Sequence, residues 1–167
     1  MAVDLTLGFI GTGGITSFLV RGLCSAPEFT GRVILSVHKN RGKAEELKEL
    51  FPERITICES NQEVADSSDV VFIAVLPQQH EAVAGAVKFK PEHRVVHITG
   101  GVKLEDSRSL YAPAARAVRA IPLPFAAMRM GPVLFYGDDP VCRELLAMLG
   151  SIVEVRAESE LEVLGPH

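Results

Sequence analysis

Residues 5–16 read LTLGFIGTGGIT, an apolar run followed at once by a glycine-rich turn. The apolar run is typical of a buried strand, and after Gly13 the apolar residues recur at the spacing of one helix face. Gly11 and Gly13 hold the first two positions of the G-x-G-x-x-G pattern, whose backbone N–H groups and helix N-terminus bind a pyrophosphate. The third position is Thr16, a β-branched residue expected to push the helix slightly away from the strand. The stretch therefore predicts a dinucleotide-binding turn, mainly from its strand–turn–helix setting.

The rest of the chain alternates short apolar runs with amphipathic segments, joined by short connections. This alternation predicts an α/β fold with a doubly wound parallel sheet, Rossmann-like, over residues 1–157. The further expected strands are residues 33–37, 55–57, 69–75, 95–98, 118–121, 132–136 and 152–155. The further expected helices are residues 44–51, 62–65 with Asn61 as the cap, a segment around 83–87, 104–110 and 140–149.

Composition sets the limits of this interpretation. Hydrophobic residues make up 47% of the 167 residues and aromatic residues only 6%, so Val, Leu, Ile and Ala must build the core, as in a parallel sheet. The formal net charge is −4, which does not indicate binding to nucleic acid or to an anionic membrane surface. The longest apolar run, residues 70–76, is far shorter than the ~20 residues that cross a membrane.

Three cysteines are scattered through the sequence, at Cys24, Cys58 and Cys142, and none lies in a Cys-x-x-Cys or Cys/His cluster. Free thiols in a reducing compartment are the expectation. The first residues contain an acidic residue and enter a strand at once, unlike a secretory signal. A cytoplasmic location is therefore expected.

The segment after the second strand discriminates between the two common dinucleotides. An acidic residue there would bind the ribose 2′-hydroxyl of NAD, but residues 32–44 contain no Asp or Glu. The segment instead contains His38, Lys39, Asn40 and Arg41, and its cationic side chains could pair with a 2′-phosphate. NADP(H) is the predicted cofactor, although ordinary surface charges would look the same.

Two more loops follow strands at the same edge of the predicted sheet, residues 75–78 (VLPQ) and 99–101 (TGG). Ligands of open α/β sheets bind outside the carboxyl ends of the strands. Gly100 and Gly101 would let the backbone approach a ribose or a nicotinamide, and a simple turn is the other interpretation.

No catalytic residue can be assigned from the sequence. The five histidines show no metal-ligand spacing, so no metal site is expected. His97 lies inside a predicted strand, where a structural role is favoured over that of a base. Arg129 could face a substrate carboxylate, but a surface role is favoured.

Taken in order, these segments resemble the N-terminal domain of the pyrroline-5-carboxylate reductase family. The matching segments are residues 8–13 (GFIGTG), Asn61 ahead of residues 68–75 (SDVVFIAV), residues 74–78 (AVLPQ), residues 100–105 (GGVKLE) and residues 118–122 (VRAIP). The resemblance implies reduction of a cyclic imine carboxylate to proline, with hydride from NADPH.

Residue by residue, the resemblance and the basic loop imply one set of cofactor contacts. The expected contacts are Ile10, Gly11, Thr12, Gly13, Gly14, Ile15, Ser36, His38, Lys39, Asn40, Arg41, Asn61, Ala74, Val75, Leu76, Pro77, Thr99, Gly100 and Gly101. The family also has a helical domain that forms its dimer and completes the substrate pocket. Residues 158–167 are either a tail or the start of that domain, so the chain is expected to bind cofactor and to turn over substrate poorly. A homo-oligomer is expected only if a helical domain follows.

Two departures from the family leave alternatives open. Leu76 stands where the family has Lys, and residues 123–125 read LPF where the family has Asn-Thr-Pro in the loop that borders nicotinamide and substrate. Such a loop would also suit another small substrate, namely a different imine, a β-hydroxyacid or a deazaflavin partner. A non-catalytic NADP-binding or sensing module, or a globular domain with a vestigial glycine turn, are further alternatives.

Overall fold

The glycine-rich stretch forms the strand–turn–helix unit that its pattern predicts. In the computed structural model, which describes residues 3–11, 13–36, 41–98, 100–114 and 116–164, β1 (Thr6–Ile10) is followed by α1 (Gly14–Ser25). Apart from half-buried Thr6, the residues of β1 are buried, as expected for a strand covered on both faces. The Gly8 position has no room for a side chain, because an added Cβ would lie 2.3 Å from Ser68 Oγ.

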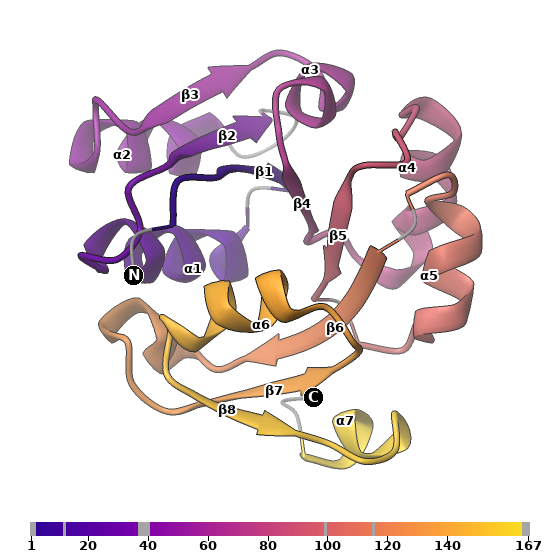
Figure 1. Ribbon diagram of the computed structural model, residues 1–167. Coiled ribbons are helices and arrows are strands. Elements are labelled where there is room, and N and C mark those ends of the chain that lie inside the picture. The colour runs from indigo at the N-terminus through magenta and orange to yellow at the C-terminus, as the bar shows by residue number, and fades with distance from the viewer. Residues whose placement is uncertain (1–2, 12, 37–40, 99, 115, 165–167) are drawn as a thin grey trace.

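The described residues form one eight-stranded sheet in the order β3-β2-β1-β4-β5-β6-β7-β8 (Figure 1). The strands after β1 are β2 (Arg32–Ser36), β3 (Ile55–Cys58), β4 (Val70–Ile73), β5 (Arg94–His97), β6 (Arg116–Pro122), β7 (Pro132–Tyr136) and β8 (Ser151–Glu154). The helices after α1 are α2 (Arg41–Leu50), α3 (Asn61–Asp66), α4 (His80–Ala86), α5 (Leu104–Leu110), α6 (Pro140–Ala147) and α7 (Ser159–Leu164), with 3-10 turns η1 (Pro77–Gln79) and η2 (Pro124–Met128).

Six strands, β1 to β6, run parallel, and the prediction of a doubly wound α/β fold is confirmed. The prediction that the whole sheet is parallel is wrong for the last two strands, because β7 pairs antiparallel with β6 and β8 then runs parallel to β7. The connection over residues 123–131 is the physical reason. It is too short for the crossover of a dozen or more residues that a parallel neighbour needs.

Two hydrophobic layers cover the sheet. The larger core lies under α1, α2 and α6, and the smaller one under α3, α4 and α5. Leu161 of α7 joins a third small cluster with Ile121 and Leu134, which attaches α7 to β6 and β7. Figure 1 shows α7 beside the strand ends, on the same side of the sheet as α5. No helix in the described ranges is both long and apolar enough to cross a membrane.

One predicted helix start needs correction. The side chain of Ser60 accepts a hydrogen bond from the Glu63 backbone N–H at 3.2 Å and is the cap of α3. Asn61 is the first residue of the helix rather than its cap. Ser and Asn are both favoured caps, so adjacent polar residues leave the helix start ambiguous by one position.

Candidate functional site

The turn after β1 lies against the chain that leaves β4. Gly11 has φ of +100°, and an added Cβ would lie 2.7 Å from the backbone oxygen of Ala74. The Ala74 N–H donates to the Ile10 carbonyl at 2.9 Å. Gly11 is therefore required by the fold itself, both for its left-handed conformation and for this close approach.

Gly13 and Gly14 differ from Gly11, because a Cβ added at either position would meet nothing within 4 Å. Gly13 has φ of −111°, which any residue adopts, so the fold itself does not require glycine there. No side chain caps the N-terminus of the twelve-residue α1, whose first turn also carries no acidic residue. The turn therefore presents open backbone and a positive helix end to an incoming group, which fits a pyrophosphate.

Thr16, which stands where the motif has its third glycine, is hydrogen-bonded to the turn. Its side chain is fully buried, and its hydroxyl donates to the Gly11 carbonyl at 2.7 Å. The β-branched residue therefore has a hydrogen-bonded place beneath the turn, where the sequence suggested only a steric defect. Ile15, the neighbouring predicted contact, is partly exposed on α1.

The basic segment after β2 is described only in part. Ser36 is buried at the end of the strand, whereas His38, Lys39 and Asn40 lie outside the described residues. Arg41 begins α2 with 56% of its side chain exposed. Its guanidinium faces acidic groups, with Nη2 3.2 Å from Glu59 Oε2 and Nη1 3.9 Å from Glu45 Oε1. Exposed pairs of this kind contribute little, so breaking the Arg41–Glu59 pair would cost little free energy.

The loops after β4 and β5 lie side by side. An added Cβ at Gly101, whose φ is +78°, would lie 4.0 Å from the Pro77 ring. Leu76 is exposed, and its backbone N–H donates to the Gln79 side chain at 2.9 Å. The structure thus brings together, at one edge of the sheet, the predicted residues Ile10, Gly11, Ala74, Pro77 and Gly101. Two further predicted contacts, Thr12 and Thr99, lie outside the described residues. Asn61 is the first residue of α3.

Sequence reasoning missed an ionic cluster beside the loop after β5. Arg119 of β6 is 2% exposed, and its guanidinium contacts Glu158 Oε1 at 2.8 Å and Glu162 Oε1 at 2.7 Å. The Gly101 N–H donates to the same Glu162 oxygen at 3.1 Å. An Arg in the middle of an apolar strand, with Glu at positions 158, 160 and 162 near the C-terminus, was the available signal, since a buried guanidinium needs carboxylate partners.

Two buried histidines adjoin these loops in the chain, His80 at the start of α4 and His97 at the end of β5. His97, at the end of β5, is fully buried, and its ring packs edge-on against His80 with centroids 4.8 Å apart. The Tyr111 hydroxyl lies 2.5 Å from His80 Nδ1, within hydrogen-bond distance. Burial lowers the pKa of His80. These residues are closed to solvent, in keeping with the structural role expected of His97.

The loop after β6 runs toward the far end of α1. An added Cβ at Gly22 would lie 2.1 Å from the Ala126 backbone oxygen, about 12 Å along α1 from Gly14 at 1.5 Å per residue. Arg129 donates to the Met148 carbonyl at 2.7 Å and pairs with Glu28 at 2.9 Å. Arg129 therefore holds a surface loop together, as favoured from the sequence.

The three cysteines are free thiols, as expected. Burial raises the pKa of Cys24 to about 11. Burial, and after it the neighbouring Glu63, raises the pKa of Cys58. Burial, together with Asp139, raises the pKa of Cys142. None of these thiols has the lowered pKa of a nucleophile.

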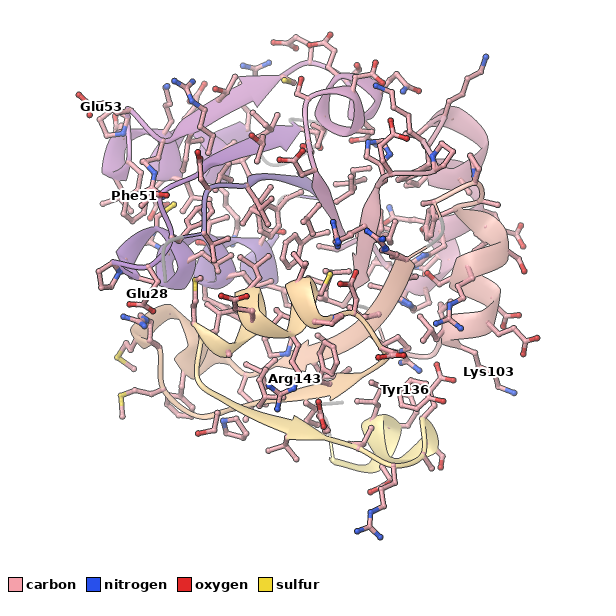
Figure 2. The ribbon with its side chains drawn as sticks, viewed as in Figure 1. Glu28, Phe51, Glu53, Lys103, Tyr136 and Arg143 are labelled. Atoms are coloured by element: carbon pink, nitrogen blue, oxygen red, sulfur yellow. The ribbon has the colours of Figure 1, made fainter. Side chains whose placement is uncertain are left out.

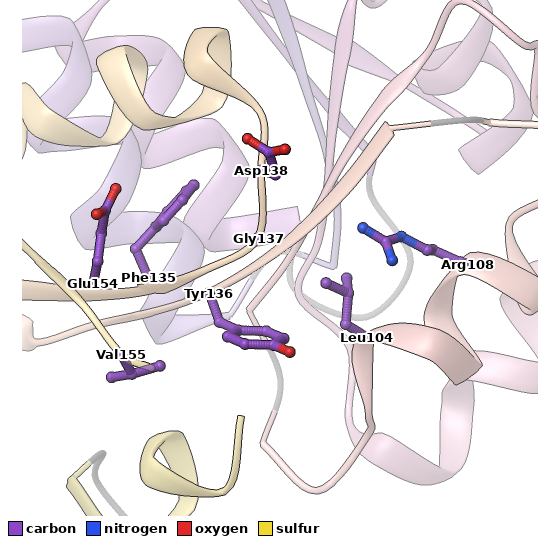
Figure 3. A pocket seen from close by; sticks show the side chains of 8 residues that line it. All are labelled: Leu104, Arg108, Phe135, Tyr136, Gly137, Asp138, Glu154 and Val155. Carbon is purple, nitrogen blue, oxygen red and sulfur yellow. The ribbon is translucent and has the colours of Figure 1, made fainter. Parts of the chain in front are cut away.

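A separate cavity of about 470 Å³ opens between α5, β7 and the end of β8. Figure 3 shows Leu104 and Arg108 on α5 across from Phe135 and Glu154, with the Tyr136 ring between them. In Figure 2 Tyr136 lies near α7, and Lys103 points outward beyond it. None of its lining residues belongs to the loops after β1, β2 or β4, and Leu104, just after the β5 loop, is where the cavity adjoins the candidate site.

Comparison with known proteins supports the resemblance seen in the sequence. The chain is 27% identical over 158 residues to a pyrroline-5-carboxylate reductase of Pisum sativum, covering 88% of this chain and 56% of that protein. It is 26% identical over 168 residues to the Pseudomonas aeruginosa enzyme, covering 95% of this chain and 60% of the relative. The chain thus spans little more than half the length of these relatives.

Solved structures share the fold. A 1-pyrroline-5-carboxylate reductase from Streptococcus pyogenes superposes with a TM-score of 0.81 at 20% identity, covering 97% of this chain and 63% of that one. The Plasmodium falciparum pyrroline carboxylate reductase, solved with NADP bound, gives a TM-score of 0.79 at 18% identity and covers 98% and 62%. At these identities the likeness establishes a Rossmann-like fold.

The family model described as "NADP oxidoreductase coenzyme F420-dependent" matches residues 6–101. This range is more than half of the chain and runs from β1 to the Gly100–Gly101 loop. It contains every residue predicted from the sequence to contact the cofactor. The chain therefore belongs to this family of NADP-dependent oxidoreductases.

Proposed function

We propose that this chain binds NADP(H) at the carboxyl edge of its sheet. The observation that carries the proposal is the open space at Gly13 and Gly14, above a helix N-terminus that no side chain caps. Glycine is not needed by the fold at Gly13, so its lack of a side chain serves close approach by a ligand. The pyrophosphate would lie on this turn, and Arg41, with the predicted contacts Lys39 and His38, would bind the 2′-phosphate.

We further propose that the protein is a reductase of 1-pyrroline-5-carboxylate, acting in proline biosynthesis. The named relatives support this activity, and the family supports the cofactor. NADPH, when bound, supplies a hydride to the imine carbon. The chain's own residues bind and orient the cofactor, with residues 1–157 as the dinucleotide-binding unit. The free thiols suit a reducing compartment, and we place the protein in the cytoplasm.

Binding of the two reduced dinucleotides to this chain tests the cofactor assignment. We expect a dissociation constant for NADPH at least about tenfold below that for NADH, because a paired phosphate contributes about 1.5–3 kcal/mol. Equal affinities, or tighter binding of NADH, would overturn the choice of NADP(H).

An activity assay with 1-pyrroline-5-carboxylate and NADPH tests the substrate. We expect poor turnover by this chain, which spans only part of its relatives' length, and proline formation by a longer protein that contains it. If a longer protein binds NADPH but reduces a different imine, the cofactor assignment stands and the substrate assignment is wrong.

A further inference from the structure

Glu158, just before α7, and Glu162, within α7, bring two carboxylates to the loop after β5. In each carboxylate, one oxygen accepts two hydrogen bonds. Glu162 Oε1 accepts from Arg119 Nη2 at 2.7 Å and from the Gly101 N–H at 3.1 Å. Glu158 Oε1 accepts from Arg119 Nη1 at 2.8 Å and from the Leu104 N–H. We call Arg119, Glu158 and Glu162 the α7 clamp, because their contacts connect β6, α7 and both ends of the 101–104 segment.

The burial of Arg119 makes this clamp hard to open. Its guanidinium is 2% exposed and always charged, so it must keep anionic partners. The same carboxylate oxygens also accept hydrogen bonds from the Gly101 and Leu104 N–H groups. The positions of these two backbone groups therefore depend on the ion pairs with Arg119. The Glu158 side chain is 21% exposed and that of Glu162 is 46% exposed, so Glu162 is the partner that solvent reaches more easily.

The position of this loop indicates which part of a dinucleotide it would meet. In sheets of this topology the pyrophosphate lies at the turn after β1 and the adenosine ribose at the end of β2. β4 and β5 lie on the other side of β1 from β2. The loop after β5, beside Pro77 of the loop after β4, therefore lies on the nicotinamide side.

We propose that Arg119, Glu158 and Glu162 are positioning residues for the nicotinamide half of the bound cofactor. They act through residues 101–104, because they accept hydrogen bonds from the Gly101 and Leu104 N–H groups, so less order has to be gained in this segment when the cofactor binds. The inference rests on the proposed NADP(H) site. It predicts that weakening the clamp impairs binding of the whole dinucleotide and spares binding of its adenosine half.

The test compares NADPH with 2′,5′-ADP, which carries the 2′-phosphate and lacks the nicotinamide half. Glu162→Gln keeps the size of the side chain and an acceptor oxygen but removes the charge that pairs with Arg119. We expect the dissociation constant for NADPH to rise about tenfold, the scale of one charge-assisted hydrogen bond, and that for 2′,5′-ADP to stay within about twofold.

Glu28→Gln is the matched control. Glu28 is also half-exposed, at 38%, and also pairs with an arginine, Arg129, at 2.9 Å, but at the far end of α1. We expect this variant to bind both ligands as the unsubstituted chain does. Hydrogen exchange gives a second readout without any cofactor, since the Gly101 amide should exchange faster in Glu162→Gln and at the original rate in Glu28→Gln.

The outcomes separate this inference from the proposed function. If Glu162→Gln binds NADPH as before, or loses NADPH and 2′,5′-ADP equally, the positioning role is wrong while the cofactor site stands. If the unsubstituted chain binds 2′,5′-ADP and not NADPH, the clamp does not prepare a nicotinamide site. If it binds neither, the proposed function fails and the inference fails with it.

Discussion

The two halves of the sheet's carboxyl edge are built in opposite ways. On the β1–β2 side, Gly13 and Gly14 face open space, and Arg41 is held only by exposed carboxylates. On the β4–β5 side, Arg119 is buried between two carboxylates, and His80 and His97, next to these loops in the chain, are buried against each other. The first half has open space and an exposed ion pair, whereas the second half is held by buried internal contacts.

This difference indicates where binding energy and order come from. Contacts to phosphate groups are strong and tolerate an exposed, adaptable partner. A nicotinamide ring offers fewer charges, so its loops gain more from being held in advance. Substitutions at Gly13 or Arg41, which the fold does not require, should therefore change affinity without changing stability, and substitutions of buried residues in the second half should change stability.

The largest effect is expected at Gly13. A Cβ there meets nothing in the protein, so Gly13→Ala should leave the free energy of unfolding within about 1 kcal/mol of the original value. The methyl group would hold a pyrophosphate away from the backbone N–H groups. Losing two charge-assisted hydrogen bonds, about 3 kcal/mol, weakens NADPH binding about 100-fold. Calorimetry of binding and thermal unfolding measure both quantities.

Gly11→Ala provides the contrast on the same turn. The added Cβ would lie 2.7 Å from the Ala74 oxygen at a φ of +100°, so this variant should lose stability as well as affinity. If Gly13→Ala proves as destabilising as Gly11→Ala, the open turn is a packing feature and its ligand role is wrong.

The next effect is expected at Arg41. Arg41→Gln removes a guanidinium expected to bind the 2′-phosphate, a contact of about 1.8 kcal/mol, so NADPH affinity should fall about 20-fold. NADH lacks that phosphate, and its affinity should not change. Lys48→Gln is the control, because Lys48 donates to backbone carbonyls at Pro52 and Ile55, away from this edge. Equal losses for NADPH and NADH would remove Arg41 from the phosphate site.

A pH effect is expected in the second half. Burial lowers the pKa of His80 from its ordinary value of 6.5, so the unfolded chain takes up the proton first as the pH falls. Stability should then be unaffected by His80 above about pH 7 and should decrease below about pH 6.5. At pH 5.5 the contribution reaches at most about tenfold in the unfolding equilibrium.

His80→Gln isolates this contribution, because the amide does not titrate in this range. We expect urea unfolding of His80→Gln to depend less on pH between 7 and 5.5 than unfolding of the original chain. Parallel pH profiles for the two proteins would show that His80 does not control acid stability.

The sequence was sufficient to predict the fold where local patterns decide it. The β1–α1 unit, the alternation of strands and helices, and the loops that meet at the carboxyl edge all follow from apolar runs and glycines close in sequence. The direction of β7 and β8 did not follow, because an apolar run carries no sign of strand direction. Only the length of the 123–131 connection pointed to an antiparallel pair.

The β1–β2 side of the candidate site could be predicted from the sequence, and the contacts of the β4–β5 side could not. Glycine positions predict the open turn after β1 from a few residues of sequence, and the nearby basic residues predict a phosphate partner that stays a prediction. The α7 clamp instead joins residues about 40 positions apart, with Arg119 paired to Glu158 and Glu162. The Arg41–Glu59 pair crosses from α2 to the end of β3 in the same way. Such contacts depend on the tertiary arrangement of the strands, which composition and spacing do not specify.

The smallest effect is expected at Glu59, and it should be a gain. Glu59 Oε2 lies 3.2 Å from Arg41 Nη2, so a 2′-phosphate must compete with it for the guanidinium. Exposed pairs are worth about 0.2–1 kcal/mol, so Glu59→Gln should tighten NADPH about threefold and leave NADH unchanged. Combined with Arg41→Gln, the substitution should give no further gain, because the competition no longer exists. If Glu59→Gln also tightens NADPH binding in the Arg41→Gln background, Glu59 repels the phosphate directly. Affinity on the β1–β2 side would then depend on overall charge rather than on the Arg41–Glu59 pair.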